Sequence, residues 1–230
     1  MTRSRTQRAI DLLLVLDAAK VVGDQKQTPG AVTFHKILFH AKLDASTRGL
    51  RAPHHQYIRW KHGPFSRDAT DDEQLLASLG LMRGHAATAR AAQLVIHYRP
   101  LVAGTIGDIL ECVERSARKR AKWSGKKAKA DCYGIRAERL GVDPSIGRTL
   151  RDLPQGTPLH LDPVGGADLR VDEDLVDDFL LDLRITDADI RASREIEFSG
   201  SVTEVEHELE RRSVRKLDHF DRLRRGDRLW

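Results

Sequence analysis

The chain has 230 residues, a formal net charge of +5 and a pI of about 9.4, and 40% of its residues are apolar. That length fits one large domain or two small ones, and the apolar share suffices for a core with long solvated helices or an extended tail beside it. No stretch reaches the roughly 18 apolar residues of a membrane span or resembles a signal-peptide core. We therefore expect a soluble, cytoplasmic protein whose basic charge permits a nucleic-acid partner without requiring one.

The first two elements are expected to be helices. Residues 3 to 22 place apolar side chains on one helical face, at Ile10, Leu13, Leu14 and Val21. Arg3, Arg5 and Arg8 lie at the start of this helix, where the helix dipole disfavours cations, so we expect a frayed or partner-facing arm. Thr33 is expected to cap a second helix that Gly49 ends, with a regular apolar set at Phe34, Ile37, Leu38 and Ala41.

A strand and a third helix follow between Gln56 and Met82. Alternation from Tyr57 to Lys61 predicts a half-buried strand, and Gly63-Pro64 is expected to stop it. Ser66 is a candidate N-cap, because the acidic residues after it favour the positive end of a helix: Asp68, Asp71, Asp72 and Glu73. Leucines give this helix its apolar stripe, and Gly80 is expected to end it.

A β-hairpin is expected next, with residues 81 to 83 paired to residues 93 to 98 across a loop from Gly84 to Arg90. Pro100 is expected to close this hairpin, and Thr105 to start another helix. Two helices followed by a hairpin are the order of a winged-helix domain. That architecture serves binding more often than catalysis.

The same stretch resembles a known family. The segments FHKILFHAKLDASTRGL, YIRWKHGPFSRD and LLASLGL, within residues 9 to 120, look like the Panacea antitoxin family, the SocA-like group. Its members share an aromatic and basic segment that ends in a Gly-Pro turn between two core helices. The resemblance implies an antitoxin that neutralises a co-encoded toxin by direct binding, with variable extensions suited to particular toxins. It also implies a structural motif, formed by Tyr57, Trp60, Lys61, Gly63, Pro64 and Phe65.

The most basic tract runs from Arg115 to Lys129, with eight Lys or Arg and no acid in fifteen residues. Such a tract is either a solvated helix face or a surface that contacts phosphates. Trp123, in its middle, either stacks on a base or packs against the core. The candidate nucleic-acid-binding residues, including two from the expected wing, are Arg83, Arg90, Arg118, Lys119, Arg120, Lys122, Lys126 and Lys127.

A Pro- and Gly-rich segment begins at Pro154 and indicates a boundary between residues 1–153, a winged-helix-like domain, and residues 154–230, a helical region. Residues 162 to 189 hold ten acids and two arginines, yet an apolar stripe predicts a folded helix. Its members Leu175, Phe179 and Leu183 are candidate partner-binding residues, and packing onto the N-terminal domain is the alternative use of the same face. A final helix over residues 202 to 225 is expected to be acidic first and basic last.

Catalytic and metal motifs are missing from the sequence. His35 and His40 are spaced too widely for one helix face, and His54-His55 lies in a loop, so structural or solvated histidines are expected. Cys112 and Cys132 lack metal-site spacing. No nucleophile elbow or phosphate-binding loop is found. We therefore expect no enzyme, no cofactor and no metal.

The sequence thus predicts a mainly α protein with a small β-hairpin (α+β), made of a winged-helix-like N-terminal domain and a helical C-terminal region. The expected function is that of an antitoxin. The alternative is a winged-helix DNA-binding transcriptional regulator without a toxin partner. Expected partners are a co-encoded protein toxin, DNA, and a second copy of the chain in a homo-oligomer, and no membrane.

Overall fold

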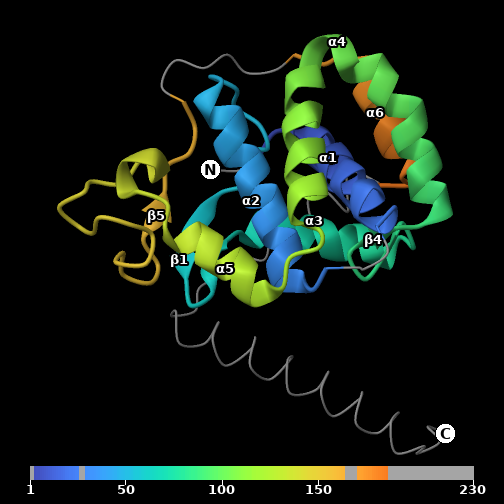
Figure 1. The fold of residues 1–230 in the computed structure, drawn as a ribbon. Coiled ribbons are helices and arrows are strands. Elements are labelled where there is room, and N and C mark those ends of the chain that lie inside the picture. Colours follow the sequence, from blue (N-terminus) through green and yellow to red (C-terminus); the bar gives the residue numbers. More distant parts are fainter. Residues whose placement is uncertain (1–2, 26–28, 164–169, 186–230) are drawn as a thin grey trace, which may run out of the picture. The chain divides into compact units, whose positions relative to one another are not determined.

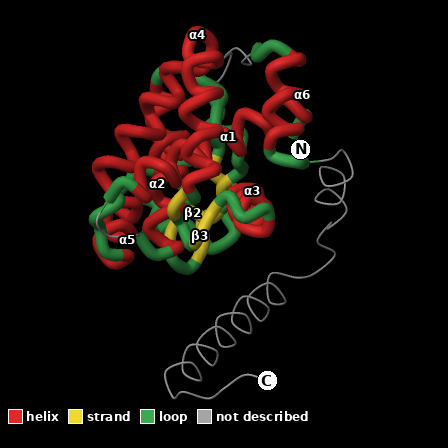
Figure 2. Tube along the Cα trace, turned by 90° about the vertical axis from the view of Figure 1, so that its right-hand side faces the viewer, coloured by secondary structure: helices red, strands yellow, loops and turns green. Residues whose placement is uncertain are grey.

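The computed structural model describes residues 3–25, 29–163 and 170–185, which all fall in one compact unit. The order of elements is α1 (Arg5–Gly23), α2 (Ala31–Thr47), β1 (Tyr57–Trp60), β2 (Gly63–Phe65), α3 (Arg67–Ser78), β3 (Met82–Arg83), β4 (Ala86–Ala87), α4 (Ala89–Arg120), α5 (Gly125–Tyr133), a 3₁₀ turn η1 (Ala137–Leu140), β5 (Pro158–Leu159) and α6 (Glu173–Asp182). The fold is mainly helical with short antiparallel strands, as the sequence predicts (Figures 1 and 2).

Helix α1 is the centre of the main core. Every residue from Arg8 to Ala19 is buried, so the helix is covered on all sides and the expected one-sided apolar face is wrong. Helix α4 packs against both α1 and α2. Helix α2 begins after Gly30 rather than at Thr33, whose buried hydroxyl instead donates to the carbonyl of Trp123 at 3.3 Å.

The Gly63-Pro64 dipeptide opens a strand instead of stopping one. β2 pairs antiparallel with β1, with Trp60 opposite Gly63 and Ile58 opposite Phe65. Pro64 is accommodated because β2 is an edge strand, where a missing N–H does not break a ladder. β5 pairs with the other edge of β1, joining Leu159 to Tyr57. Residues 57 and 159 therefore belong to one sheet, across the boundary predicted at residue 153.

The expected long hairpin is wrong. β3 pairs with β4 in a tight hairpin closed by Gly84 and His85, and residues 93 to 98 are helical, within α4. Helix α4 also contains Pro100, which closes no hairpin. The helix bends at Ile106, whose φ and ψ are −121° and 16°, directly after the residue where a new helix was expected.

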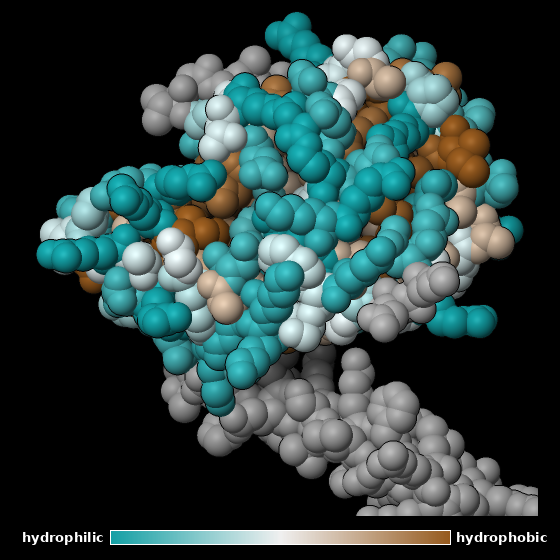
Figure 3. Space-filling model, viewed as in Figure 1, coloured by the Kyte–Doolittle hydropathy of each residue, from teal (hydrophilic) through white to brown (hydrophobic). Residues whose placement is uncertain are grey.

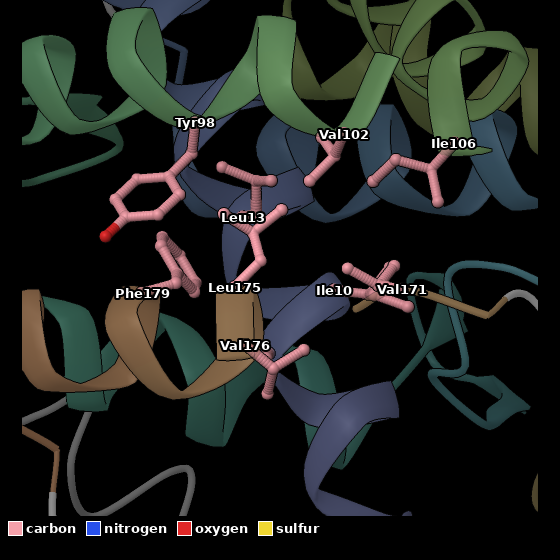
Figure 4. Close-up of a pocket in the computed structure, with 10 residues that line it drawn as sticks. Ile10, Leu13, Tyr98, Val102, Ile106, Val171, Leu175, Val176 and Phe179 are labelled. Atoms are coloured by element: carbon pink, nitrogen blue, oxygen red, sulfur yellow. The ribbon is translucent and has the colours of Figure 1, made fainter. Parts of the chain in front are cut away.

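Helix α6 confirms the helix predicted from the acidic segment, and it covers α1 and α4. Phe179 packs edge-on against Tyr98 with ring centroids 5.0 Å apart, beside a small apolar cavity of about 20 Å³ between the three helices (Figure 4). Among the described helices, none has the length and apolar content required to cross a membrane. The helix predicted over residues 202 to 225 lies outside the described residues.

Candidate functional site

The Gly-Pro turn is held from beneath by α2. Gly63 is buried with φ at +102°, and the buried Lys36 ammonium donates a hydrogen bond to the carbonyl of Pro64. Burial lowers the pKa of Lys36 to about 8. A Cβ at position 63 would lie 3.2 Å from Cε of Lys36, so the turn and the lysine fit each other closely.

The strands beside this turn have an inner and an outer face. On the inner face Tyr57 is buried and meets Phe39 edge-on at 5.3 Å. On the outer face Trp60 and Phe65 are half-buried, with ring centroids 6.2 Å apart. Lys61 is exposed at the tip of the hairpin. The predicted structural motif is thus one hairpin, with an anchored inner side and an aromatic outer side; we call Trp60 and Phe65 the hairpin aromatic pair.

A cluster of charges is buried between α1, α3 and the loop before β1. The side chains of Asp11, His55 and Asp72 are fully buried. Nε2 of His55 lies 3.0 Å from Oδ2 of Asp72, and Nδ1 of His54 lies 3.0 Å from Oδ1 of Asp11. Arg3 donates to both carboxylates, at 2.9 Å to Asp11 and 2.5 Å to Asp72.

This cluster corrects the expectation for the N-terminal arginines. Arg3 and Arg8 point into the protein, and Nε of Arg8 lies 3.5 Å from Oδ1 of Asp72. Only Arg5, which pairs with Asp177 at 2.8 Å, is substantially exposed among the three arginines. The N-terminal segment is therefore attached to α3 through Arg3, which contacts Asp72. The sequence signal was Asp11 itself, a carboxylate within an otherwise apolar helical run.

The ionisation of the two aspartates follows from their partners. Burial alone would raise both pKa values, but His55, His54 and Arg3 together hold the pKa of Asp11 well below its usual range. The pKa of Asp72 is likewise lowered by hydrogen bonds and charge from His55 and Arg3 against the effect of burial. One ligand atom each from Asp11, His55 and Asp72 lies within 4.8 Å of the others, a spacing that suits a metal ion. The guanidinium of Arg3 already supplies the cation at this place, so we interpret the cluster as structural.

A second group brings the buried thiol of Cys132 and the buried imidazole of His40 together with the exposed carboxylate of Asp131, without the geometry of a catalytic triad. Sγ of Cys132 lies 3.4 Å from Nε2 of His40, and Oδ2 of Asp131 lies 2.9 Å from the same nitrogen. In a triad the carboxylate contacts the other ring nitrogen and leaves Nε2 for the nucleophile. Burial raises the pKa of Cys132 to about 12, so the thiol stays protonated near neutral pH.

The basic tract divides into neutralised and free cations. Arg115 pairs with Glu111 at 2.6 Å and Arg118 with Glu114 at 2.7 Å, each one helical turn away. Arg120 is buried, and its Nη1 donates to Oγ of Ser116 at 3.3 Å. Arg118 and Arg120 are therefore poorly placed for the phosphate contacts predicted from sequence. Thr33, which contacts the carbonyl of Trp123, helps to hold the turn after α4.

Four lysines of the tract are exposed, at positions 119, 122, 126 and 127, and Lys129 is half-buried. Nζ of Lys127 lies 4.7 Å from the ring centroid of Trp123, which is half-buried. The structure also brings three cations to the ring of Tyr133: Lys129 lies 5.3 Å, Arg59 5.4 Å and Arg151 5.9 Å from the ring centroid. Positions 59 and 151 are brought together by folding alone, so no spacing rule would have found them.

The remaining candidates serve other contacts. Arg83 is exposed on β3, and Arg90 donates to the carbonyl of Asp182 at 2.8 Å, at the opposite end of α4 from Arg120. Phe179 and Leu183 are buried in the main core, and Leu175 packs against its edge. The apolar stripe of α6 therefore has the alternative use, packing onto the N-terminal elements, and in this arrangement it offers no surface to a partner.

The comparisons with known proteins returned no match: no family model, no curated protein and no solved structure is similar to the chain.

Proposed function

We propose that the chain is the antitoxin of a toxin–antitoxin pair and neutralises a co-encoded protein toxin by direct binding. One observation carries this proposal. The segments through which the sequence resembles the SocA-like group form a single connected unit, because Lys36 of FHKILF donates to Pro64 of the Gly-Pro turn. The helix that follows is capped by Ser66, whose hydroxyl accepts from Ala69 N at 3.2 Å.

The hairpin aromatic pair is the surface that we assign to the toxin. Tryptophan, tyrosine and arginine are enriched among the residues that dominate protein–protein binding energy. Trp60 and Phe65 are half-buried on the outer face of β1 and β2, which the Gly-Pro turn fixes in place. A partner that covers these rings gains apolar contact without reordering the strands.

The alternative, a winged-helix DNA-binding regulator, has less support. In such proteins the helix before the hairpin enters the major groove. Here that helix is α3, whose partly exposed carboxylates are Asp68, in its first turn, and Asp71; the carboxylates of Asp72 and Glu73 point into the protein. Carboxylates along the groove-facing helix repel the phosphate backbone instead of displacing its counterions.

Co-expression with the product of the neighbouring gene tests the proposal. If that product arrests growth, the chain should restore growth, and the double variant Trp60→Ala/Phe65→Ala should fail to do so at equal abundance. A matched control is Ile96→Ala/Leu101→Ala, which removes two apolar side chains that are 54% and 55% exposed on α4. Rescue that is unaffected by the Trp60/Phe65 variant would place the toxin contact elsewhere, and growth arrest without rescue would refute the antitoxin function.

A further inference from the structure

Beyond Arg118 lie several cations for which the described residues supply no carboxylate partner. We define the α5 basic surface as Lys119, Lys122, Lys126, Lys127, Lys129 and Arg151. Within the described part of the chain, none of these side chains is paired with a carboxylate, whereas Arg115 and Arg118 just before them both are. The nearby Asp131 is engaged by His40 and Arg120. The positive charge of this surface is therefore uncompensated.

Two aromatic rings hold part of this charge in place without cancelling it. Lys127 lies over Trp123 at 4.7 Å, and Lys129 and Arg151 approach Tyr133 at 5.3 and 5.9 Å. A cation–π contact orients an ammonium or guanidinium group while its full charge remains. The hydroxyl of Tyr133 donates to the carbonyl of Lys61 at 2.8 Å, which fixes this ring against the β1–β2 hairpin.

The positive charge also affects a neighbouring histidine, His62. The pKa of His62 is lowered by partial burial and then by the charges of Lys129, Lys61 and Lys36. Helix α5 adds to the field, because its positive end lies at Gly125, between Lys122 and Lys126. Figure 3 shows hydrophilic side chains over much of the face on which α5 is seen in Figure 1.

We propose that the α5 basic surface binds the sugar–phosphate backbone of nucleic acid without reading its sequence. Five of its six residues are lysines, which contact phosphates as point charges. A lysine ammonium is a compact charge on a flexible stem and needs no fixed acceptor geometry, which suits contact with a phosphate backbone whatever its sequence. The rings of Trp123 and Tyr133 already carry cations, so they position phosphate contacts rather than stack on bases.

This inference is independent of the antitoxin function, because its test needs no toxin. Anisotropy of a labelled mixed-sequence DNA duplex, titrated with the full chain at increasing salt, should show binding whose logarithmic affinity falls by about 0.9 per contact for each unit of log salt. The variant Lys122→Gln/Lys126→Gln/Lys127→Gln should flatten that slope by up to about 2.7, three such contacts. A second duplex of scrambled sequence should bind equally well.

The matched control removes cations that already have carboxylate partners. Arg115→Gln/Arg118→Gln deletes two positive charges from the same tract and should leave the slope nearly unchanged. A further variant, Lys119→Gln/Arg151→Gln, should flatten the slope even if the first variant is unstable. Absence of binding at low salt, equal effects of the paired and unpaired cations, or competition by polyglutamate as strong as by nucleic acid would each overturn the proposal, the last in favour of an acidic protein.

Discussion

At the scale of single residues, Gly63 is the position where backbone conformation matters most. Its φ of +102° is a region that L side chains rarely adopt, and Lys36 closes the space where a Cβ would lie. The glycine thus allows β1 and β2 to turn directly above a buried ammonium group. Replacing it tests whether the Gly-Pro turn is structural.

Gly63→Val should lower the free energy of unfolding by more than about 1 kcal/mol, because a β-branched residue is strained at positive φ. For a chain of this size the melting temperature should fall by at least about 2–4 °C. Gly104→Ala is the control: nothing lies within 4 Å of the added Cβ inside helix α4, so this change should be neutral or slightly stabilising. Equal melting temperatures for wild type and Gly63→Val would show that the turn tolerates side chains.

Glu73 is a second residue whose contribution to stability can be measured. Oε2 of Glu73 lies 3.2 Å from Nε2 of His35, and Oε1 contacts Nδ1 of His85. Burial would raise the pKa of Glu73, but hydrogen bonds from the two histidines lower it to about 2. This carboxylate links α3 to α2 and to the β3–β4 hairpin, where Phe34 stacks on His85 at 5.3 Å.

Because the pKa of Glu73 is lowered in the folded state, the free energy of unfolding depends on pH. The contribution of Glu73 is fully present above its ordinary pKa of about 4.5 and is lost as the pH falls toward about 2. Glu73→Gln should therefore cost about 2–3 kcal/mol at neutral pH and much less below pH ~3. Chemical denaturation at several pH values measures this difference, with the exposed Glu138→Gln as control. A difference between wild type and Glu73→Gln that is constant with pH would contradict the assignment.

At the scale of elements, α6 shows why one stripe of residues had two interpretations. Its apolar face predicts a folded helix whatever it packs against, so the pattern alone does not distinguish a partner from the chain's own core. The structure shows Phe179 against Tyr98, and Asp182 accepting hydrogen bonds from Tyr98 and Arg90. These contacts come from α4, which is distant in sequence.

Phe179→Ala should destabilise the protein by about 3 kcal/mol or more, because it enlarges the cavity between α1, α4 and α6. Leu181→Ala is the matched control on the same helix, where the side chain is 74% exposed, and should change stability by less than about 0.5 kcal/mol. The melting temperatures of both variants test whether α6 packs through Phe179. The reverse order, with Leu181 costly and Phe179 neutral, would mean that α6 does not dock in this orientation.

Local signals in the sequence predicted both ends of α3 but not the start of α2 or the hairpin. Ser66 caps α3 and Gly80 follows its end because capping depends on neighbouring residues alone. Residues 93 to 98 have the β-branched and aromatic character of a strand, but packing decides strand formation more than propensity does. The buried positions in this part of α4, Val95, Tyr98 and then Val102, recur at helical spacing, which continues through Pro100 to the bend at Ile106.

Contacts between distant residues account for the parts of the sites that the sequence did not predict. Arg3 and Asp72 are 69 positions apart and meet only because α1 lies beside α3. Arg151 reaches Tyr133 because β5 and the segment before it return to β1. The basic tract itself was predicted, but the burial of Arg120 was not, because its neighbour Asp131 comes from α5. The pairing of Arg118 with Glu114 is different: its i,i+4 spacing is present in the sequence and was overlooked.

At the scale of the whole molecule, the described chain combines one anchored hairpin with one uncompensated basic surface. The tyrosine that fixes Lys129 and Arg151 also donates to the hairpin, through Lys61. β5, from beyond the predicted boundary, completes the same sheet. Removing everything after residue 156 would therefore strip a strand from β1 as well as helix α6, and point variants separate binding from folding more cleanly.

Direct binding of the toxin at the hairpin aromatic pair is the central claim, and calorimetric titration of the purified chain with the purified product of the neighbouring gene tests it most directly. We expect saturable binding that Trp60→Ala/Phe65→Ala weakens by about 30-fold or more, the effect of losing about 2 kcal/mol at an interface centre. Ile96→Ala/Leu101→Ala should bind like wild type, and all proteins should melt cooperatively. No heat of binding, or equal affinity for wild type and the Trp60/Phe65 variant, would contradict the claim.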